Sequence, residues 1–198
     1  MEGAMDTRAI RHPNHIRLLA SPVRHELVDT LAALGGKATV SELALELGRP
    51  ADGLYYHLEL LAEGGLVREF VNDAGERGFA IQGARRAPLR LAYDLSTDDA
   101  RDALAQYAKG LLQVAERDFG TALARSDVEV AGPRRELWAA RNKGWVAERD
   151  LAEANRLLER LCELMSQTRD DERTRLMSLA FVLAPAPQKG KRRTKTAG

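Results

Sequence analysis

Apolar residues near the start of the chain recur at the three- and four-residue spacing of amphipathic helices. A first helix is predicted from Ser21, with a proline in its first turn, to the glycine pair at 35–36 that ends it. A second begins at the capping box Thr39–Glu42 and stops at Gly48–Pro50. A third covers residues 51–63, with three leucines on one face. The pattern therefore predicts three short helices in close succession.

Two strand-like runs follow the third helix. They cover residues 66–71 and 78–81, and the segment between them is rich in Asn, Asp and Gly, the residues that favour turns. This arrangement predicts a β-hairpin directly after the three helices.

The second half of the chain has the pattern of longer helices. Ser96–Asp99 is predicted to cap a helix whose apolar stripe reaches Phe119, and another helix is predicted over residues 146–165. Apolar runs at 136–142 and 175–183 predict one or two short strands. The predicted fold class is α+β and mostly helical. Its domains are residues 1–86, a helical region over 87–188, and a basic disordered tail over 189–198.

The helix over residues 146–165 has a broad apolar seam of the kind that packs against a partner helix. The seam residues are Leu151, Ala154, Leu158, Leu161 and Met165. Two further leucines widen this surface beyond what one helix of the same chain would cover. We therefore expect the seam to form a homodimer interface.

The N-terminal segments also resemble a known family. Ser21–Leu27, Thr39–Ala44, Leu54–Leu58 and Leu61–Val67 are similar, in this order, to segments of ArsR-like winged helix-turn-helix transcriptional regulators. The resemblance covers about the first two fifths of the chain. It implies a homodimeric bacterial regulator that binds an operator in double-stranded DNA and answers to an effector. We expect a repressor rather than an activator, and a palindromic operator, because two-fold symmetry of a dimer would place two recognition helices on the DNA.

Carried over position by position, the resemblance places the recognition helix at residues 51–63 and the DNA-reaching wing at the hairpin. The residues expected to contact DNA are Arg49, Asp52, Tyr55, Tyr56, His57, Arg68 and Arg77. The tyrosines and Asp52 would read base edges, whereas the arginines would contact phosphates. Two alternatives stay open: only one of the adjacent tyrosines reaches DNA, and His57 is a packing or capping residue instead of a base reader.

The charge balance keeps an alternative function open. The chain has 30 Lys+Arg against 29 Asp+Glu, acidic residues slightly outnumber basic ones in 1–86, and none of residues 51–66 is Lys or Arg. A typical DNA-binding domain is basic. The first domain is therefore also compatible with a winged-helix module that docks on another protein and does not bind specific DNA sequences.

Other classes of function lack support in the sequence. One cysteine, Cys162, excludes an intramolecular disulfide, and no catalytic motif, cofactor motif or metal-ligand spacing is present, so we expect no enzyme. The apolar runs are too short to span a membrane, and a cytoplasmic location is expected. His25 and Glu26 are expected at the surface of the first helix.

A small-molecule effector, if there is one, is expected to be apolar or aromatic. The second half offers aromatic surface for it in Tyr107, Phe119, Trp138 and Trp145. The alternative is that these aromatic residues only fill the core of a dimerisation element.

Overall fold

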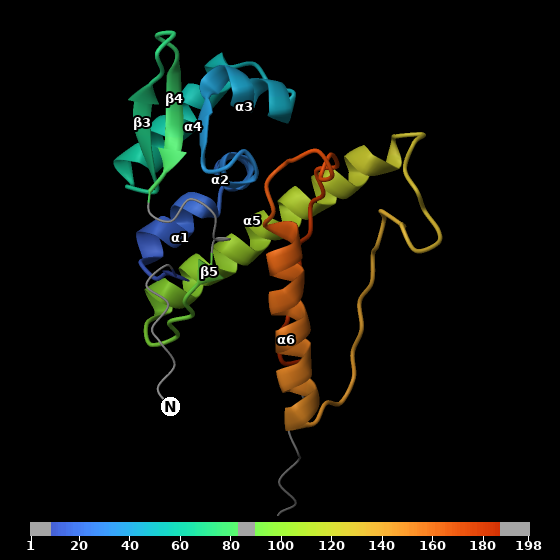
Figure 1. Cartoon of the computed structure of the whole chain (residues 1–198). Helices are drawn as coiled ribbons and strands as arrows, with labels where there is room; N and C mark the ends of the chain where they lie inside the picture. Colours follow the sequence, from blue (N-terminus) through green and yellow to red (C-terminus); the bar gives the residue numbers. More distant parts are fainter. Residues whose placement is uncertain (1–8, 83–89, 187–198) are drawn as a thin grey trace, which may run out of the picture.

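The computed structural model describes residues 9–82 and 90–186 (Figure 1). The three predicted N-terminal helices are present as α2 (Pro22–Ala33), α3 (Val40–Leu47) and α4 (Asp52–Glu63). The capping box at the start of α3 is formed: the Thr39 amide donates to Glu42 Oε2 at 2.7 Å, and the Glu42 amide donates to Thr39 Oγ1 at 3.1 Å. Gly48 ends α3 at φ 60°, a left-handed conformation that favours glycine.

The predicted hairpin consists of β3 (Val67–Val71) and β4 (Arg77–Ile81), which pair antiparallel. A third strand, β2 (Lys37–Thr39), pairs antiparallel with β4 and gives the order β2-β4-β3. The sequence pattern missed β2 because a three-residue strand has too few positions to show alternation. Three helices and this sheet form a winged helix-turn-helix domain, as the sequence predicted.

One hydrophobic core holds this domain together. The leucines of α4 that face inward are fully buried with Phe79 of β4 and the apolar faces of α2 and α3. Burial of each such side chain contributes about 1.5–3 kcal/mol. The core therefore fixes which face of α4 remains exposed.

Two N-terminal elements were not predicted. They are β1 (Ala9–Ile10) and α1 (Pro13–Leu19), and β1 pairs parallel with β5 (Arg90–Leu91). The pairing of β1 with β5 is a long-range contact, and two residues carry no detectable period.

The long helix α5 (Asp98–Leu123) packs against α1 and α2. The helix is present as predicted, but its N-cap is Thr97, which accepts from the Ala100 amide at 3.2 Å, one residue after the Ser96 that begins the predicted capping segment. Its most deeply buried positions are small residues displaced from the leucine-rich stripe. At Gly110 a Cβ would lie 2.1 Å from the carbonyl oxygen of Ala20. The backbone of α5 therefore approaches the backbone at Ala20 closely through Gly110, and the large apolar residues of α5 lie beside this contact.

Beyond α5 the chain is extended, and α6 (Glu148–Met165) stands apart from the N-terminal domain (Figure 1). The helix confirms the prediction over 146–165. The strands predicted at 136–142 and 175–183 are wrong, because both segments are irregular. A strand needs a neighbour for its backbone hydrogen bonds, and the structure pairs neither segment in a sheet.

Some predicted features lie outside the described residues. They are the junction between the first two domains, at 86–87, and the basic tail over 189–198. Among the residues that the structure does describe, no helix combines the length and hydropathy that a membrane crossing requires.

Candidate nucleic-acid interface

The exposed face of α4 is the most distinctive surface of the N-terminal domain. Because its leucines point into the core, Asp52 and Tyr56 face outward, and the Tyr56 side chain is 65% exposed. A tyrosine held on a rigid helix can enter a DNA groove and offer both a ring and a hydroxyl. The geometry places Tyr56 where the sequence predicts a base-reading residue.

Tyr55 has a different environment from its neighbour. It is half-buried against the core, and the Arg77 guanidinium carbon lies 5.2 Å from the centre of its ring. This contact joins α4 to the turn end of the wing. Tyr55 is therefore half-buried where Tyr56 is exposed, and which of the two reaches DNA stays a prediction.

Arg77 makes several contacts with acidic side chains. It donates to Glu59 at 3.0 Å and to Glu69 at 2.5 and 2.9 Å. The hydrogen bonds that Arg77 donates to Glu69, and then the one to Glu59, raise the pKa of Arg77, and the bonds to Glu69 lower the pKa of Glu69. Arg68, on the other strand of the wing, is exposed and has no ion pair in the part of the chain that the structure describes.

Arg49 lies in the turn between α3 and α4. Its guanidinium is 2.9 Å from the Glu26 carboxylate of α2. His57 is half-buried nearby, and its pKa is lowered by burial and then by the positive charges of Arg24 and Arg49. Its Nδ1 is buried and has no partner among the described residues. His57 therefore lies half-buried near two cations, and its role as a base reader or a packing residue stays a prediction.

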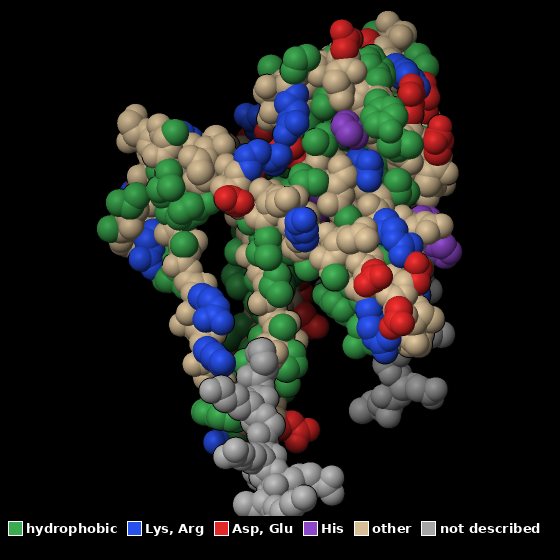
Figure 2. All heavy atoms as spheres, turned by 180° about the vertical axis from the view of Figure 1, so that it is seen from behind, with side chains coloured by type: hydrophobic (Ala, Val, Ile, Leu, Met, Phe, Trp, Pro, Cys, Tyr) green, Lys and Arg blue, Asp and Glu red, His purple; other side chains and the backbone are tan. Residues whose placement is uncertain are grey.

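Arg24 is a cationic residue that the sequence analysis missed. Its Nε donates to the Leu18 carbonyl at 2.5 Å, which holds the guanidinium at the start of α2. No ion pair involves Arg24 within residues 9–82 and 90–186. Its position on a helix outside the helix-turn-helix pair gave no signal in the sequence. Seen from behind, Lys and Arg side chains gather beside a histidine on the N-terminal domain, at the top of the view (Figure 2).

Acidic side chains also line this region. Asp52, Glu59 and Glu63 are exposed on α4, and Glu69 lies on β3. The interface therefore has mixed charge, with cations at its edges and carboxylates on the recognition helix.

His25 differs from the sequence expectation. We expected a surface residue, but His25 is only 3% exposed. The physical reason is α5, which lies across α2 and places Tyr107 against the histidine ring. A partner helix from the second half of the chain cannot be inferred from the α2 sequence alone.

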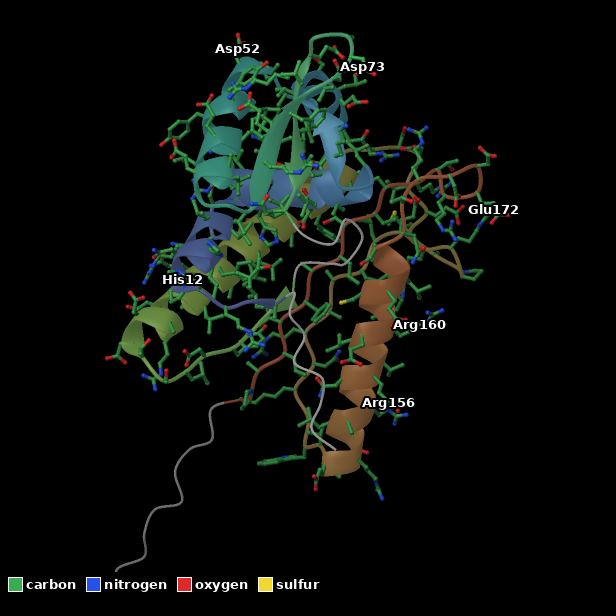
Figure 3. The ribbon with its side chains drawn as sticks, turned by 60° about the vertical axis from the view of Figure 1, so that its left-hand side comes forward. His12, Asp52, Asp73, Arg156, Arg160 and Glu172 are labelled. Carbon is green, nitrogen blue, oxygen red and sulfur yellow. The ribbon has the colours of Figure 1, made fainter. Side chains whose placement is uncertain are left out.

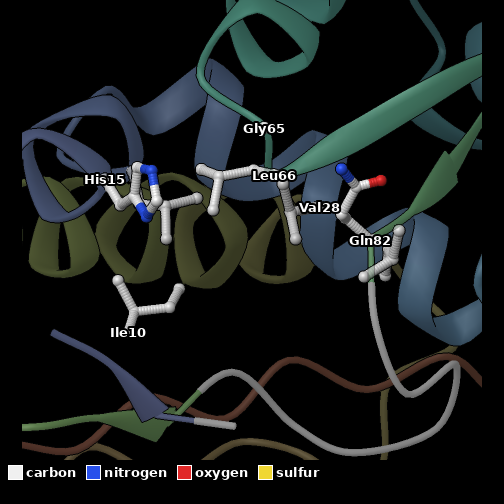
Figure 4. Close-up of a pocket in the computed structure, with 8 residues that line it drawn as sticks. Ile10, His15, Val28, Gly65, Leu66 and Gln82 are labelled. Atoms are coloured by element: carbon white, nitrogen blue, oxygen red, sulfur yellow. The ribbon is translucent and has the colours of Figure 1, made fainter. Parts of the chain in front are cut away.

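The aromatic residues that we expected to bind an effector are mostly exposed to solvent or in contact with other side chains. Trp145 is 91% exposed, and Trp138 packs under the Arg135 guanidinium at 3.4 Å. A cavity of about 160 Å³ lies elsewhere, between α1, α2 and the base of the wing (Figure 4). Its lining residues are Ile10, His15, Leu19, Val28, Gly65, Leu66, Ile81 and Gln82.

The predicted seam of α6 is only partly covered. Leu151, Leu161 and Met165 are exposed, Ala154 and Leu158 are half-buried, and no residue of α6 is buried. Exposed leucines on one helix face are costly in water. The residues described in this chain leave the seam open, and its occupant stays a prediction.

Comparison with known proteins supports the N-terminal assignment. Residues 19–69, about a quarter of the chain, match the family model described as a helix-turn-helix domain. The match coincides with α2, α3, α4 and the start of the wing. Helix-turn-helix domains of this kind bind DNA in transcription regulators. The match therefore supports the assignment of this chain as a DNA-binding transcription regulator.

The remaining comparisons add little. A search of curated proteins finds no match. Among solved structures, one match is the X-ray crystal structure of the YusO protein from Bacillus subtilis. The two sequences are 13% identical, and the matched region covers 70% of this chain and 73% of the YusO chain, with a TM-score of 0.27. A TM-score this low does not establish a shared arrangement of the two chains.

Proposed function

We propose that the protein is a homodimeric transcriptional regulator of the ArsR-like kind, and a repressor, that binds a palindromic operator through α4 and the wing. The observation that carries this proposal is the outward face of α4, which presents Tyr56 from a helix fixed by a buried leucine face. A rigid helix with an exposed aromatic side chain is suited to base readout.

The contacts divide into two groups. Tyr56 and Asp52 read base edges, Asp52 by accepting from cytosine. Arg49 and Arg68, together with Arg24, contact backbone phosphates and position the domain. Arg77 and Tyr55 support the first group, because the guanidinium joins the wing to α4 through Glu59.

Assembly follows from the seam of α6. A second copy covers the exposed leucines, and two-fold symmetry brings two recognition helices about 34 Å apart, the repeat of one DNA turn. The operator of such a dimer is a palindrome.

The test is binding of the full chain to duplexes from the DNA that flanks its own gene, at several salt concentrations, against a scrambled duplex of equal length. The proposal predicts tighter binding to one flanking duplex and a linear fall of log affinity with log salt. A symmetric protected site in footprinting would support the dimer. If the protein shows salt-dependent binding to none of the duplexes, the proposal is contradicted.

A second candidate function is a docking module for another protein. The observation that favours it is the acidic character of α4, together with the engagement of Arg77 by two carboxylates. Phosphates would be repelled by Glu59 and Glu63, whereas a basic protein surface would be attracted. The same binding experiment separates the two candidates, because a docking module does not distinguish flanking DNA from scrambled DNA.

A further inference from the structure

The carboxylate of Glu26 lies between two arginines from different parts of the fold. Its Oε2 accepts from Arg49 Nη2 at 2.9 Å, and its Oε1 accepts from Arg117 Nη2 at 2.7 Å. Glu26 belongs to α2, Arg49 to the turn before the recognition helix, and Arg117 to α5. One side chain of α2 therefore connects the turn of the DNA-binding motif with the long helix behind it.

Burial makes this contact stronger than an ordinary surface pair. The Glu26 side chain is 18% exposed, about half the exposure of either arginine side chain. Charges that are partly removed from water interact more strongly and are screened less by salt. Each oxygen of Glu26 has one arginine, so the two cations share one negative charge.

A DNA phosphate would compete with Glu26 for the same guanidinium. An arginine paired with a carboxylate must give up or share that partner to bind phosphate. Arg117 weakens the attraction between Glu26 and Arg49, because the positive charge of Arg117 neutralises part of the Glu26 carboxylate charge. Arg117 also contacts Asp118 at 3.2 Å, so its own charge is divided between two carboxylates.

We infer that Glu26 sets the affinity for DNA by competing with a backbone phosphate for Arg49, and that Arg117 weakens this competition. The inference rests on the proposed function, since it assigns Arg49 to a phosphate. It makes Glu26 and Arg117 positioning residues that act through Arg49. A displacement of α5 along α2 would change the Arg117 contact and therefore DNA affinity, without any change at α4.

The test uses two charge-neutralising variants that should act in opposite directions. Glu26→Gln releases Arg49, so binding to a random duplex should tighten by about two- to fivefold, the range of a partly exposed ion pair. The salt slope should become steeper by roughly one, the value for one additional phosphate contact. Arg117→Gln leaves Glu26 to Arg49 alone, so binding should weaken by a similar factor.

Matched controls separate this effect from net charge. Glu116→Gln removes an exposed carboxylate next to Arg117, and Arg101→Gln removes an exposed arginine that pairs with Asp98 on the same helix. Both should change binding by less than the corresponding test variant. In the Arg49→Gln background, Glu26→Gln should have no further effect on affinity or on the salt slope.

The outcomes distinguish this inference from the function on which it rests. If the wild type binds DNA but Glu26→Gln binds equally or more weakly, Glu26 does not compete and the inference fails while the function stands. If the Glu26→Gln effect persists without Arg49, the inference also fails. If the wild type binds no duplex, both fail. Should Glu26→Gln not fold, Arg117→Gln alone decides, because unchanged or tighter binding contradicts the competition.

Discussion

The hydroxyl of Tyr107 lies 3.3 Å from Nε2 of His25, and the two rings are 5.0 Å apart. His25 belongs to α2 and Tyr107 to α5, so this contact joins the DNA-binding domain to the long helix. Burial raises the pKa of the Tyr107 phenol and lowers that of His25, which keeps both groups neutral near pH 7. The pair is therefore a neutral hydrogen bond inside the interface between α2 and α5.

Removal of this hydroxyl should lower the free energy of unfolding. Tyr107→Phe keeps the ring but leaves Nε2 of His25 without its phenol partner, at a cost of about 0.5–1.5 kcal/mol. Urea unfolding at pH 7.5 measures the loss. Tyr93→Phe is the matched control. Tyr93 is 76% exposed, so loss of its hydroxyl should leave the free energy of unfolding almost unchanged. Equal stability of the wild type and Tyr107→Phe would show that the hydroxyl does not contribute.

The stabilisation that neutral His25 provides should be lost as the solution becomes more acidic. The folded-state pKa of His25 lies below its ordinary value of about 6.5, so the unfolded chain binds the proton more readily. The stabilisation is fully present above pH 6.5 and is lost as the pH decreases below it. The Asp29 carboxylate lies 3.5 Å from His25 Nε2, and burial raises its pKa to about 7, so its protonation acts in the opposite direction over the same pH range. The difference between the urea midpoints of the wild type and His25→Gln should therefore shift against the wild type from pH 7.5 to 6.5 and 5.5. A constant difference would assign the pH dependence to other groups, and His15→Gln serves as the control.

Tyr56 should discriminate between DNA sequences. Its ring is exposed on α4 and makes no contribution to the buried core, so Tyr56→Ala should not lower the unfolding midpoint. On the proposed operator the variant should lose about 1–3 kcal/mol, with a much smaller loss on scrambled DNA. Fluorescence anisotropy with both duplexes measures the difference. Tyr93→Ala removes another exposed ring and should bind normally, and an equal loss on both duplexes would assign Tyr56 to the phosphate backbone.

The two wing arginines should differ in their contribution to DNA binding. Arg68 has no ion pair in the described residues, whereas Arg77 is held by Glu59 and Glu69. Arg68→Ala should therefore reduce the salt slope by roughly one, with a smaller reduction for Arg77→Ala. Arg77→Ala should instead weaken operator binding by loosening Tyr55 and α4. Equal slopes for the two variants would show that the Arg77 ion pairs open when DNA binds.

Local signals in the sequence predicted the N-terminal elements well. The Thr39–Glu42 capping box, the glycine stop at Gly48 and the three leucines of α4 each act within a few residues, so α3 and α4 could be predicted without a partner. Contacts between distant residues could not be predicted. The pairing of β1 with β5 and the packing of α5 on α2 depend on long-range contacts, which local periodicity does not report.

The candidate site shows the same limit. Tyr56 could be placed on the outward face of α4 because helix geometry fixes which residues share a face with the leucines. The partners of Arg49 and Arg77 could not be predicted, because Glu26 and Glu69 lie on other elements. Sequence alone therefore indicated which residues carry charge but not which charges are already paired. Pairing decides how much each arginine can contribute to phosphate binding.

The seam of α6 should determine the oligomeric state. Leu158 is half-buried and Leu161 is 42% exposed, and no residue of α6 is buried within the chain. Replacement of both leucines by Glu would place like charges against each other across a two-fold interface, where unpaired buried charge is costly. The core of the N-terminal domain does not include α6, so the double variant should keep its helical circular dichroism and become monomeric.

The control for this variant lies on the opposite face of the same helix. Arg156 and Arg160 project from α6 and are exposed (Figure 3). Arg156→Gln with Arg160→Gln changes the net charge by the same two units but leaves the seam intact, so this variant should remain dimeric. Sedimentation equilibrium at micromolar concentration measures both variants. A monomeric wild type would contradict the dimer, and a dimeric Leu158→Glu, Leu161→Glu variant would place the interface on another surface. Loss of dimerisation should also weaken operator binding more than scrambled-DNA binding, because only the palindrome engages two recognition helices at once.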